Sequence, residues 1–156
     1  GFNNVDSFAE AFRKIQAVGI GVHALIVFGF PEDTIETFDE TVKYLEDNGI
    51  PIAEFFIYTP YPKTPEGKRI LDEGKIIDTD LNHYRETYVV FKHPHLSSEE
   101  IVSGYWRAMK SFYSLKSIFK RIIKGNFKDK GYHFASNLYY WAKVKRGIIP
   151  VYFGKS

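Results

Sequence analysis

The chain has 156 residues, of which 44% are hydrophobic and 26% charged, with a net charge of +2 and no cysteine. This length and apolar content suit one folded domain and exclude an intrinsically disordered segment. The lack of cysteine excludes disulfides, thiolate zinc sites, cysteine nucleophiles and an iron–sulfur cluster held by cysteines of this chain. No run reaches the roughly 18 apolar residues of a membrane span, and the first residues lack a signal-peptide pattern, so we expect a soluble, cytoplasmic protein.

The charges are distributed unevenly along the chain. Residues 107–156 contain twelve Lys and Arg against one acid, Asp129, whereas residues 1–106 contain nine basic and eighteen acidic residues. Either the acidic residues of the same protein neutralise the basic surface, or that surface faces an anionic partner. The stretch Tyr139–Arg146 leaves two interpretations open: a surface for a membrane or RNA, or core packing with lysines that extend to water.

A helix followed by a strand is predicted at the start of the chain. Ser7 and Glu10 have capping-box spacing, and the apolar residues after them repeat at helical spacing to about Val18. Val22–Phe28 is a nearly continuous apolar run of strand length, which is typical of a parallel strand covered on both faces.

The same order repeats in the next segment. Asp33 with Glu36 predicts the start of a second helix, which residues 48–49 (Asn-Gly) end. Ile52–Tyr58 then predicts a second strand. Short links in this order imply two parallel strands joined by a right-handed crossover.

Two parallel strands need further strands and cover on both faces. A strand as apolar as residues 22–28 would otherwise expose edges that aggregate. The sequence therefore predicts an α/β fold: the last two βα units of a parallel, partial TIM-type barrel, followed by a mostly helical C-terminal extension.

A rigid segment follows the second strand. In residues 57–65 (IYTPYPKTP), three prolines fix the backbone and hold the residues before them away from helix. Ordering a flexible loop costs roughly 1–2 kcal/mol per residue, so a stiff segment suits the wall of a binding site. We call residues 57–65 the proline segment.

The second half of the chain is predicted to be mostly helical. A short helix is expected from Thr64–Pro65 to Gly74, followed by a short strand over 88–91. A Ser97–Glu100 capping box opens a long helical tract, which is broken near Ser114 and interrupted at Gly125. A last helix is expected over 132–145.

Histidines are the residues most open to a metal or catalytic interpretation. His23 is expected to be structural, because it lies about 13 Å along the strand from Val27. His93 and His95 could bind a metal from one side of an extended segment, although the lack of a nearby third ligand favours loop histidines. His83 with Tyr84 could contact a substrate, and a packing pair at a helix edge is favoured.

Two segments carry a resemblance to a known family. Residues 27–34 (VFGFPEDT) and residues 59–65 (TPYPKTP) resemble the strand ends in the last third of a radical S-adenosylmethionine (SAM) barrel. The closer resemblance is to the cobalamin-binding group, whose usual forms are near GxPGET and TPxPGTP. The tail from about Gly67, including residues 83–84 and 89–91, resembles an extension of unassigned role in part of that group. The implied domains are 1–66, the C-terminal part of the barrel, and 67–156, the helical extension.

The resemblance implies a set of SAM contacts at the carboxyl ends of the strands. Val27 matches the apolar residue that meets adenine, and Gly29 lets the backbone approach a flat ring. The proline segment, through Thr59 and Tyr61, matches the adenine side of the pocket. Asp33 matches the acid of the family's fifth strand and is expected to cap the second helix.

Several positions depart from the family's pattern, and a plainer interpretation stays open. Leu25, Glu32 and Lys63 stand where the family has glycines. Gly29 and Pro31 would also serve as ordinary turn formers between a strand and a helix.

The resemblance implies an activity that this chain cannot perform alone. The intact protein would hold SAM and a [4Fe-4S] cluster and would cleave SAM reductively to a 5′-deoxyadenosyl radical. It would act as an oxidoreductase or methyltransferase on an unactivated carbon. Cobalamin would be an optional further cofactor. The cluster cysteines lie upstream in the family and are absent here. Implied partners are the missing N-terminal barrel, a cobalamin-binding domain and a small-molecule or lipid-like substrate.

No residue of this chain is predicted to be a catalytic acid, base, nucleophile or metal ligand. The alternative function is a noncatalytic module whose basic, aromatic tail binds an anionic membrane or RNA. For the enzyme hypothesis, a membrane surface remains a candidate partner and nucleic acid is not expected.

Overall fold

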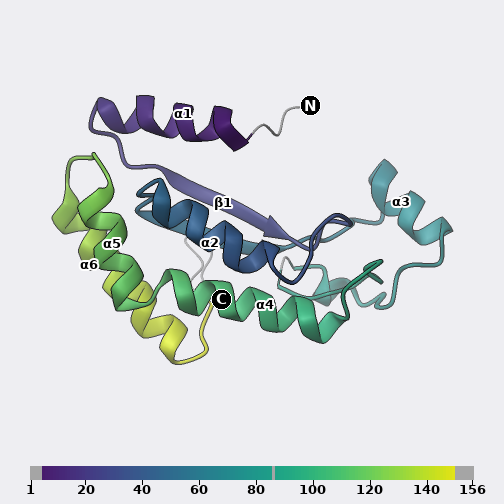
Figure 1. Cartoon of the computed structure of the whole chain (residues 1–156). Helices are drawn as coiled ribbons and strands as arrows, with labels where there is room; N and C mark the ends of the chain where they lie inside the picture. Colours follow the sequence, from purple (N-terminus) through teal and green to yellow (C-terminus); the bar gives the residue numbers. More distant parts are fainter. Residues whose placement is uncertain (1–4, 86, 150–156) are drawn as a thin grey trace. The chain divides into compact units, whose positions relative to one another are not determined.

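The structure, a computed structural model, describes residues 5–85 and 87–149 (Figure 1). In chain order the elements are α1 (Val5–Ala17), β1 (His23–Phe28), α2 (Thr37–Asp47), β2 (Ile52–Ile57), α3 (Pro65–Asp72), the short 3₁₀ helix η1 (Leu81–His83), α4 (Ser98–Phe112), α5 (Leu115–Lys124) and α6 (Lys130–Lys145). Within these residues, no helix is both long and apolar enough to cross a bilayer.

The chain forms two compact units. Unit 1 comprises Gly1–Leu25, Glu40–Glu54 and Met109–Ser156, and unit 2 comprises Ile26–Asp39 and Phe55–Ala108. Each strand gives its first residues to unit 1 and its last residues to unit 2. The carboxyl ends of both strands, where the family resemblance implies the SAM contacts, therefore belong to unit 2. The domain boundary predicted at residue 66 stays a prediction.

The two strands are neighbours in one parallel sheet, as the sequence predicted. At the carboxyl end, the Tyr58 amide donates a hydrogen bond of 2.7 Å to the Phe28 carbonyl. The α/β class is confirmed, whereas the described residues contain two strands and do not form a barrel. The barrel remains a prediction.

The prediction that β1 is covered on both faces is wrong for this chain. Ala24 and Phe28 are buried, but Leu25 is 66% and Val27 40% exposed. Successive side chains of a strand point to opposite faces, so one face of β1 packs into the core and the other is open to solvent.

Several predicted helix ends differ from the structure. α1 begins at Val5, so Ser7 lies inside the helix and the Ser7–Glu10 capping box is not its start. α2 begins at Thr37 rather than near Asp33, and residues 31–32 and 35–36 before it form turns. Gly49, with φ of +61°, follows α2 as predicted.

The extension follows its local signals closely. Thr64 caps α3, and the reciprocal bonds of the Ser97–Glu100 capping box precede α4 (Ser97 N to Glu100 Oε2, 2.7 Å; Glu100 N to Ser97 Oγ, 3.1 Å). The helical tract breaks where expected, since Ser114 caps α5. Residues 88–91 form only an isolated antiparallel bridge, Ile76 to Phe91, so the predicted short strand is wrong.

The core of unit 1 is built around a buried cation, Arg121 of α5. Its guanidinium donates to the carbonyls of Ile50, Pro51 and Phe112 and to Asn137 Oδ1, the last two at 2.8 and 2.9 Å. It also lies 3.6 Å above the centre of the Phe112 ring. Burial lowers the pKa of Arg121 to about 10, which leaves it charged at neutral pH. The carbonyls of the α2–β2 link are thereby tied to α5 and α6.

The core of unit 2 is aromatic. Phe28 of β1 lies 4.6 Å from Phe38 and 5.8 Å from Phe55, measured between ring centres. Gly104 of α4 faces Phe38, and a Cβ there would come within 2.7 Å of that ring. A glycine at this position therefore lets α4 approach the aromatic layer that supports the ends of the strands.

Candidate functional site

The turn after β1 is the first part of the candidate site. Gly29 has a φ of +95°, a conformation that residues with a side chain rarely adopt. A Cβ at Gly29 would meet only ordinary contacts, at 3.7 Å from Tyr58 Cβ and 3.8 Å from the Phe91 ring. The backbone conformation, rather than crowding, is the reason for glycine here.

Asp33 closes this turn instead of capping α2. Its Oδ2 accepts hydrogen bonds from the amides of Gly29 (2.7 Å) and Phe30 (3.1 Å), and its own amide donates to the Phe30 carbonyl. The predicted role of Asp33 as the cap of the second helix is therefore wrong. One carboxylate holds two consecutive amides and fixes the conformation of the strand end.

His93 anchors the same turn from the extension. Its Nε2 lies 2.8 Å from the Phe30 carbonyl, and its Nδ1 lies 3.1 and 3.0 Å from the amides of His95 and Leu96. Because backbone amides can only donate, Nδ1 must accept and the proton must lie on Nε2. Both ring nitrogens are occupied, and His93 is only 5% exposed.

The metal interpretation of His93 and His95 finds no support in this geometry. Among the described residues, no group of three or more His, Cys, Asp or Glu side chains could hold a metal ion. His93 is a structural loop histidine, as favoured from the sequence. Its contact with Phe30, 63 residues away, had no sequence signal.

Aromatic rings pack beside the turn. Tyr58, directly after β2, lies 5.1 Å from Phe30 and 5.3 Å from Phe91 between ring centres. Burial and the nearby Glu66 carboxylate raise the pKa of Tyr58, so its hydroxyl stays protonated at neutral pH. These rings form a rigid support for the residues at the two strand ends.

The four residues predicted to contact SAM all lie in unit 2. Val27, the last residue but one of β1, is 40% exposed, and Tyr61 of the proline segment is 44% exposed. Thr59 is buried, and its hydroxyl donates to the Ile57 carbonyl at 3.1 Å. Val27, Gly29 and Thr59 thus lie at the same ends of two neighbouring strands. Their role as SAM contacts stays a prediction.

The proline segment is held by the start of α3. The Tyr61 carbonyl accepts from the Thr64 amide (3.0 Å) and the Thr64 hydroxyl (2.8 Å). Gly67 packs so closely that a Cβ there would lie 1.9 Å from the Tyr61 oxygen. The segment is therefore fixed by hydrogen bonds and close packing as well as by its prolines.

His83 and Tyr84 both contact Asp78. His83 Nδ1 lies 2.7 Å from Asp78 Oδ2, the Tyr84 hydroxyl donates to the Asp78 carbonyl, and the His83 ring stacks on Tyr88. The Asp80 amide, and after it His83, lower the pKa of Asp78. The packing interpretation favoured for His83 and Tyr84 agrees with these contacts.

His23 pairs with an acid that sequence reasoning missed. His23 Nε2 lies 3.2 Å from Glu54 Oε1, and Glu54 is only 7% exposed. The pair joins β1 to β2 within unit 1, in agreement with a structural role for His23.

The aromatic tail, Tyr139–Arg146, is partly buried and partly exposed, and its role as a binding surface stays a prediction. Tyr140 is buried and lies 5.2 Å from Tyr113 between ring centres, whereas Tyr139 is 58% exposed. Lys143 lies 5.2 Å above the Tyr139 ring, and Lys145 the same distance above Trp141. The helix therefore contributes to the core and also presents aromatic and basic groups to solvent.

Acidic residues of α2 neutralise part of the basic half. Lys120 lies 2.9 Å from Glu46 and 3.2 Å from Asp47, and Lys124 lies 3.6 Å from Asp47. Hydrogen bonds from Lys43 and Lys120 lower the pKa of Asp47 to about 2. The first interpretation of the uneven charge distribution is thus supported for this helix pair.

Comparisons with known proteins find partial matches. The chain is 29% identical over 135 residues to an uncharacterized methyltransferase of Pyrococcus horikoshii, a match that covers 85% of this chain and 27% of the relative. It is 30% identical over 112 residues to the hopanoid C-2 methylase of Rhodopseudomonas palustris, covering 72% of this chain and 20% of that protein. No family model matches the chain.

A further relative has a different reaction in its name. The anaerobic magnesium-protoporphyrin IX monomethyl ester cyclase of Cereibacter sphaeroides is 27% identical over 110 residues, covering 70% of this chain and 18% of the cyclase. The methylase and the cyclase belong to the radical SAM family. The chain therefore spans between 18% and 27% of the length of these three relatives. All three are named as enzymes, which does not favour the noncatalytic module.

Proposed function

We propose that this chain is the C-terminal part of a radical SAM enzyme, in which the carboxyl ends of β1 and β2 form the adenosine side of the SAM pocket. The observation that carries the proposal is the parallel pairing of two strands whose family-like segments fall at the same end. In barrels of this type, ligands bind at that end. The partial matches to radical SAM proteins support the same family.

The residues at the strand ends suit the adenosine part of SAM. Val27 and Tyr61 offer exposed apolar surface. Gly29 is buried and shapes the turn after Val27 through its positive φ. Asp33 already accepts from the amides of Gly29 and Phe30, so the turn does not reorganise when a ligand binds. Thr59 acts through its backbone, because its hydroxyl is bonded to Ile57.

The open face of β1 supports the proposal of a larger barrel. His23, Leu25 and Val27 alternate with buried residues and are exposed in this chain. Parallel strands in barrels carry apolar residues on both faces because both are covered. The remaining strands of the complete protein would cover this face.

The chain does not fit as a holder of the [4Fe-4S] cluster, because it has no cysteine. We place the cluster on the N-terminal part of the barrel, where its reduction of bound SAM would supply the radical that starts the reaction. The roles of this chain are to bind and orient the adenosine part and to exclude water from it. Cobalamin and its binding domain are a finer proposal, motivated by the resemblance to the cobalamin-binding group.

The relatives' names support a proposal for the reaction class and the substrate class. These include a hopanoid C-2 methylase and a magnesium-protoporphyrin IX monomethyl ester cyclase. We propose a methyltransferase or oxidoreductase that acts on a small-molecule or lipid-like substrate.

The test is SAM binding by the complete protein with its cluster reconstituted under anaerobic conditions. Val27→Asp should weaken SAM binding by about tenfold or more, because a carboxylate would replace the apolar contact with adenine. Val102→Asp is the matched control, since Val102 of α4 is 37% exposed and belongs to the same unit. The control should bind SAM like the wild type.

Two results would contradict the proposal. The first is that the wild-type protein, with its cluster intact, does not bind SAM. The second is equal SAM affinity in Val27→Asp and the wild type, measured by calorimetry on folded samples.

A further inference from the structure

One face of α5 is apolar and open to solvent. Leu115, Phe119 and Ile123 recur every fourth residue, which places them on the same side of the helix. They are 42%, 52% and 75% exposed. A surface helix normally packs such a stripe against the core, so a continuous exposed stripe points to a partner.

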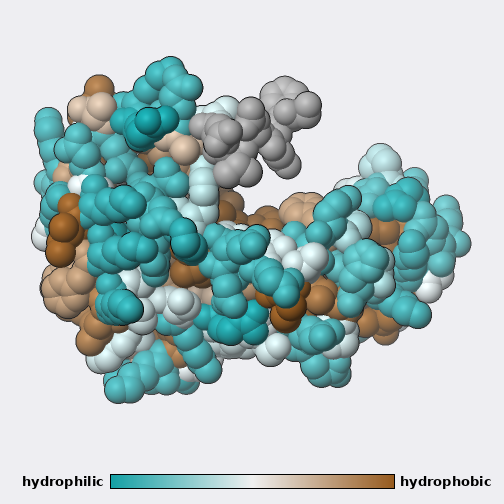
Figure 2. Space-filling model, viewed as in Figure 1, coloured by the Kyte–Doolittle hydropathy of each residue, from teal (hydrophilic) through white to brown (hydrophobic). Residues whose placement is uncertain are grey.

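α6 extends this surface. Its apolar residues lie on all sides: Tyr140 and Val144 are buried, whereas Tyr139 is 58% exposed. Phe119 lies 5.3 Å from Phe134 between ring centres, so α6 adjoins the exposed stripe at Phe119. Figure 2 shows hydrophobic side chains at the surface over these two helices. We call the exposed residues Leu115, Phe119, Ile123 and Tyr139 the α5–α6 surface.

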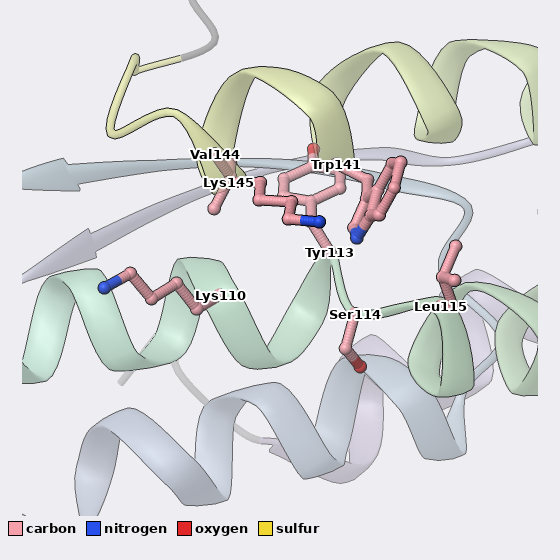
Figure 3. Close-up of a pocket in the computed structure, with 7 residues that line it drawn as sticks. All are labelled: Lys110, Tyr113, Ser114, Leu115, Trp141, Val144 and Lys145. Atoms are coloured by element: carbon pink, nitrogen blue, oxygen red, sulfur yellow. The ribbon is translucent and has the colours of Figure 1, made fainter.

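A pocket of about 490 Å³ adjoins this surface where α4, α5 and α6 meet. Its lining residues are Lys110, Tyr113, Ser114, Leu115, Trp141, Val144 and Lys145. Trp141 and Lys145 project from α6 near Tyr113, and Leu115, the first residue of the stripe, lies beside Trp141 (Figure 3). The lining contains two lysines and an indole N–H but no acid, so it suits an anion.

The charge around the pocket is positive. In residues 109–149 the sole acid is Asp129. Lys120 and Lys124 are balanced by Glu46 and Asp47. Four further basic residues lie in or next to the last turns of α4 and α6: Lys110, Lys143, Lys145 and Arg146.

These cations also stabilise the helix ends that they occupy, through the helix dipole. The helix-dipole effect accounts for the cations alone. It does not account for the adjacent pocket or for the exposed aromatic and aliphatic side chains. The boundary between lipid and water favours this combination of side chains: apolar residues, tyrosine, tryptophan and lysine.

We propose that the α5–α6 surface and its pocket bind an anionic phospholipid bilayer. Leu115, Phe119 and Ile123 enter the boundary between headgroups and acyl chains, and Lys110 and Lys145 contact lipid phosphates. This inference goes beyond the proposed function and does not depend on SAM binding. It would bring an enzyme to substrates that dissolve in membranes.

The first test measures binding of the complete protein to vesicles by sedimentation. Vesicles of phosphatidylcholine and phosphatidylglycerol in equal amounts should bind the protein, and pure phosphatidylcholine vesicles should not. Ile123→Asp should reduce the affinity about tenfold or more, because it removes an inserted side chain and adds repulsion. Ile77→Asp, at a residue 54% exposed in unit 2, is the matched control and should bind normally.

The second test addresses the pocket. Lys145→Ala should weaken binding about fivefold, as expected for one cation near an anionic surface, whereas Lys92→Ala should have no effect. In a Trp106→Phe background, Trp141 fluorescence should shift to shorter wavelength when anionic vesicles are added. The affinity should fall steeply as salt is raised.

Several outcomes would overturn the proposal. One is equal vesicle binding by Ile123→Asp and Ile77→Asp. Another is the absence of binding to anionic vesicles together with a loss of thermal stability in Ile123→Asp, which would show that another part of the protein covers the surface. Binding of RNA that the same variants abolish, without vesicle binding, would identify a different partner.

Discussion

At the residue scale, Gly29 joins the backbone conformation of the turn to the proposed function. Its φ of +95° and the two amides held by Asp33 fix the end of β1. The sequence singled out Gly29 through a family-like segment. The positive φ and the true partner of Asp33 became clear only from the structure, because the acid could equally have capped a helix.

The first prediction concerns Gly29→Ala. The substitution should destabilise the protein by about 1–2 kcal/mol, because alanine pays a conformational cost at positive φ while its Cβ meets only ordinary contacts. Urea unfolding monitored by circular dichroism measures this. Gly131→Ala is the control, since nothing lies within 4 Å of the added Cβ and Gly131 is within α6. It should be neutral or stabilising by up to about 1 kcal/mol.

If Gly131→Ala destabilised the protein as much as Gly29→Ala, the positive φ of Gly29 would not be the cause of the destabilisation.

At the element scale, α5 makes different contacts on different sides. One side carries Arg121, which ties the carbonyls of Ile50 and Pro51 to the helix core. Another carries Lys120 and Lys124 against the acids of α2. The docking of α5 onto α2 in unit 1 therefore depends in part on charge.

The second prediction is the pH dependence of this docking. Because the pKa of Asp47 is lowered from 3.8 to about 2, its stabilising contribution is fully present above pH 3.8 and is lost as the pH falls towards 2. Asp47→Asn should cost roughly 1 kcal/mol or less at neutral pH, since solvent screens this exposed cluster. The difference from the wild type should disappear near pH 2 in urea unfolding experiments.

Salt provides the control for this prediction, because about 1 M salt should also shrink the difference at neutral pH. A difference that is constant with both pH and salt would show that Asp47 acts through packing rather than charge.

At the scale of the whole molecule, the open face of β1 marks where the chain needs further cover. Leu25 is 66% exposed on a strand whose other face carries the buried Ala24 and Phe28. Exposed apolar strands pair with other chains, so the 156-residue chain alone should self-associate.

The third prediction is that Leu25→Ser raises the monomer fraction of the isolated chain in size-exclusion chromatography. Leu81→Ser, at a residue 71% exposed outside the sheet, should leave the elution profile unchanged. In the complete protein the same Leu25→Ser change should lower the melting temperature, because the face is then buried. A stable complete protein with Leu25→Ser would contradict the proposed barrel.

Local signals determined much of the fold. Apolar periodicity located the two strands and most of the helices, and the capping residues Thr64 and Ser97 gave helix starts correctly. The break expected near Ser114 lies where the structure has it. These features depend on bonds between residues three or four positions apart, so the sequence alone contains them.

Only the tertiary structure revealed the long-range polar contacts. His93 reaches Phe30 across 63 residues, and Arg121 is buried within a segment that reads as a basic helix surface. Such contacts depend on which backbone carbonyls folding leaves without a partner, and no local pattern records this. The sequence determined where the strands, caps and candidate segments lie, whereas folding decided which side chains hold the strand ends in place.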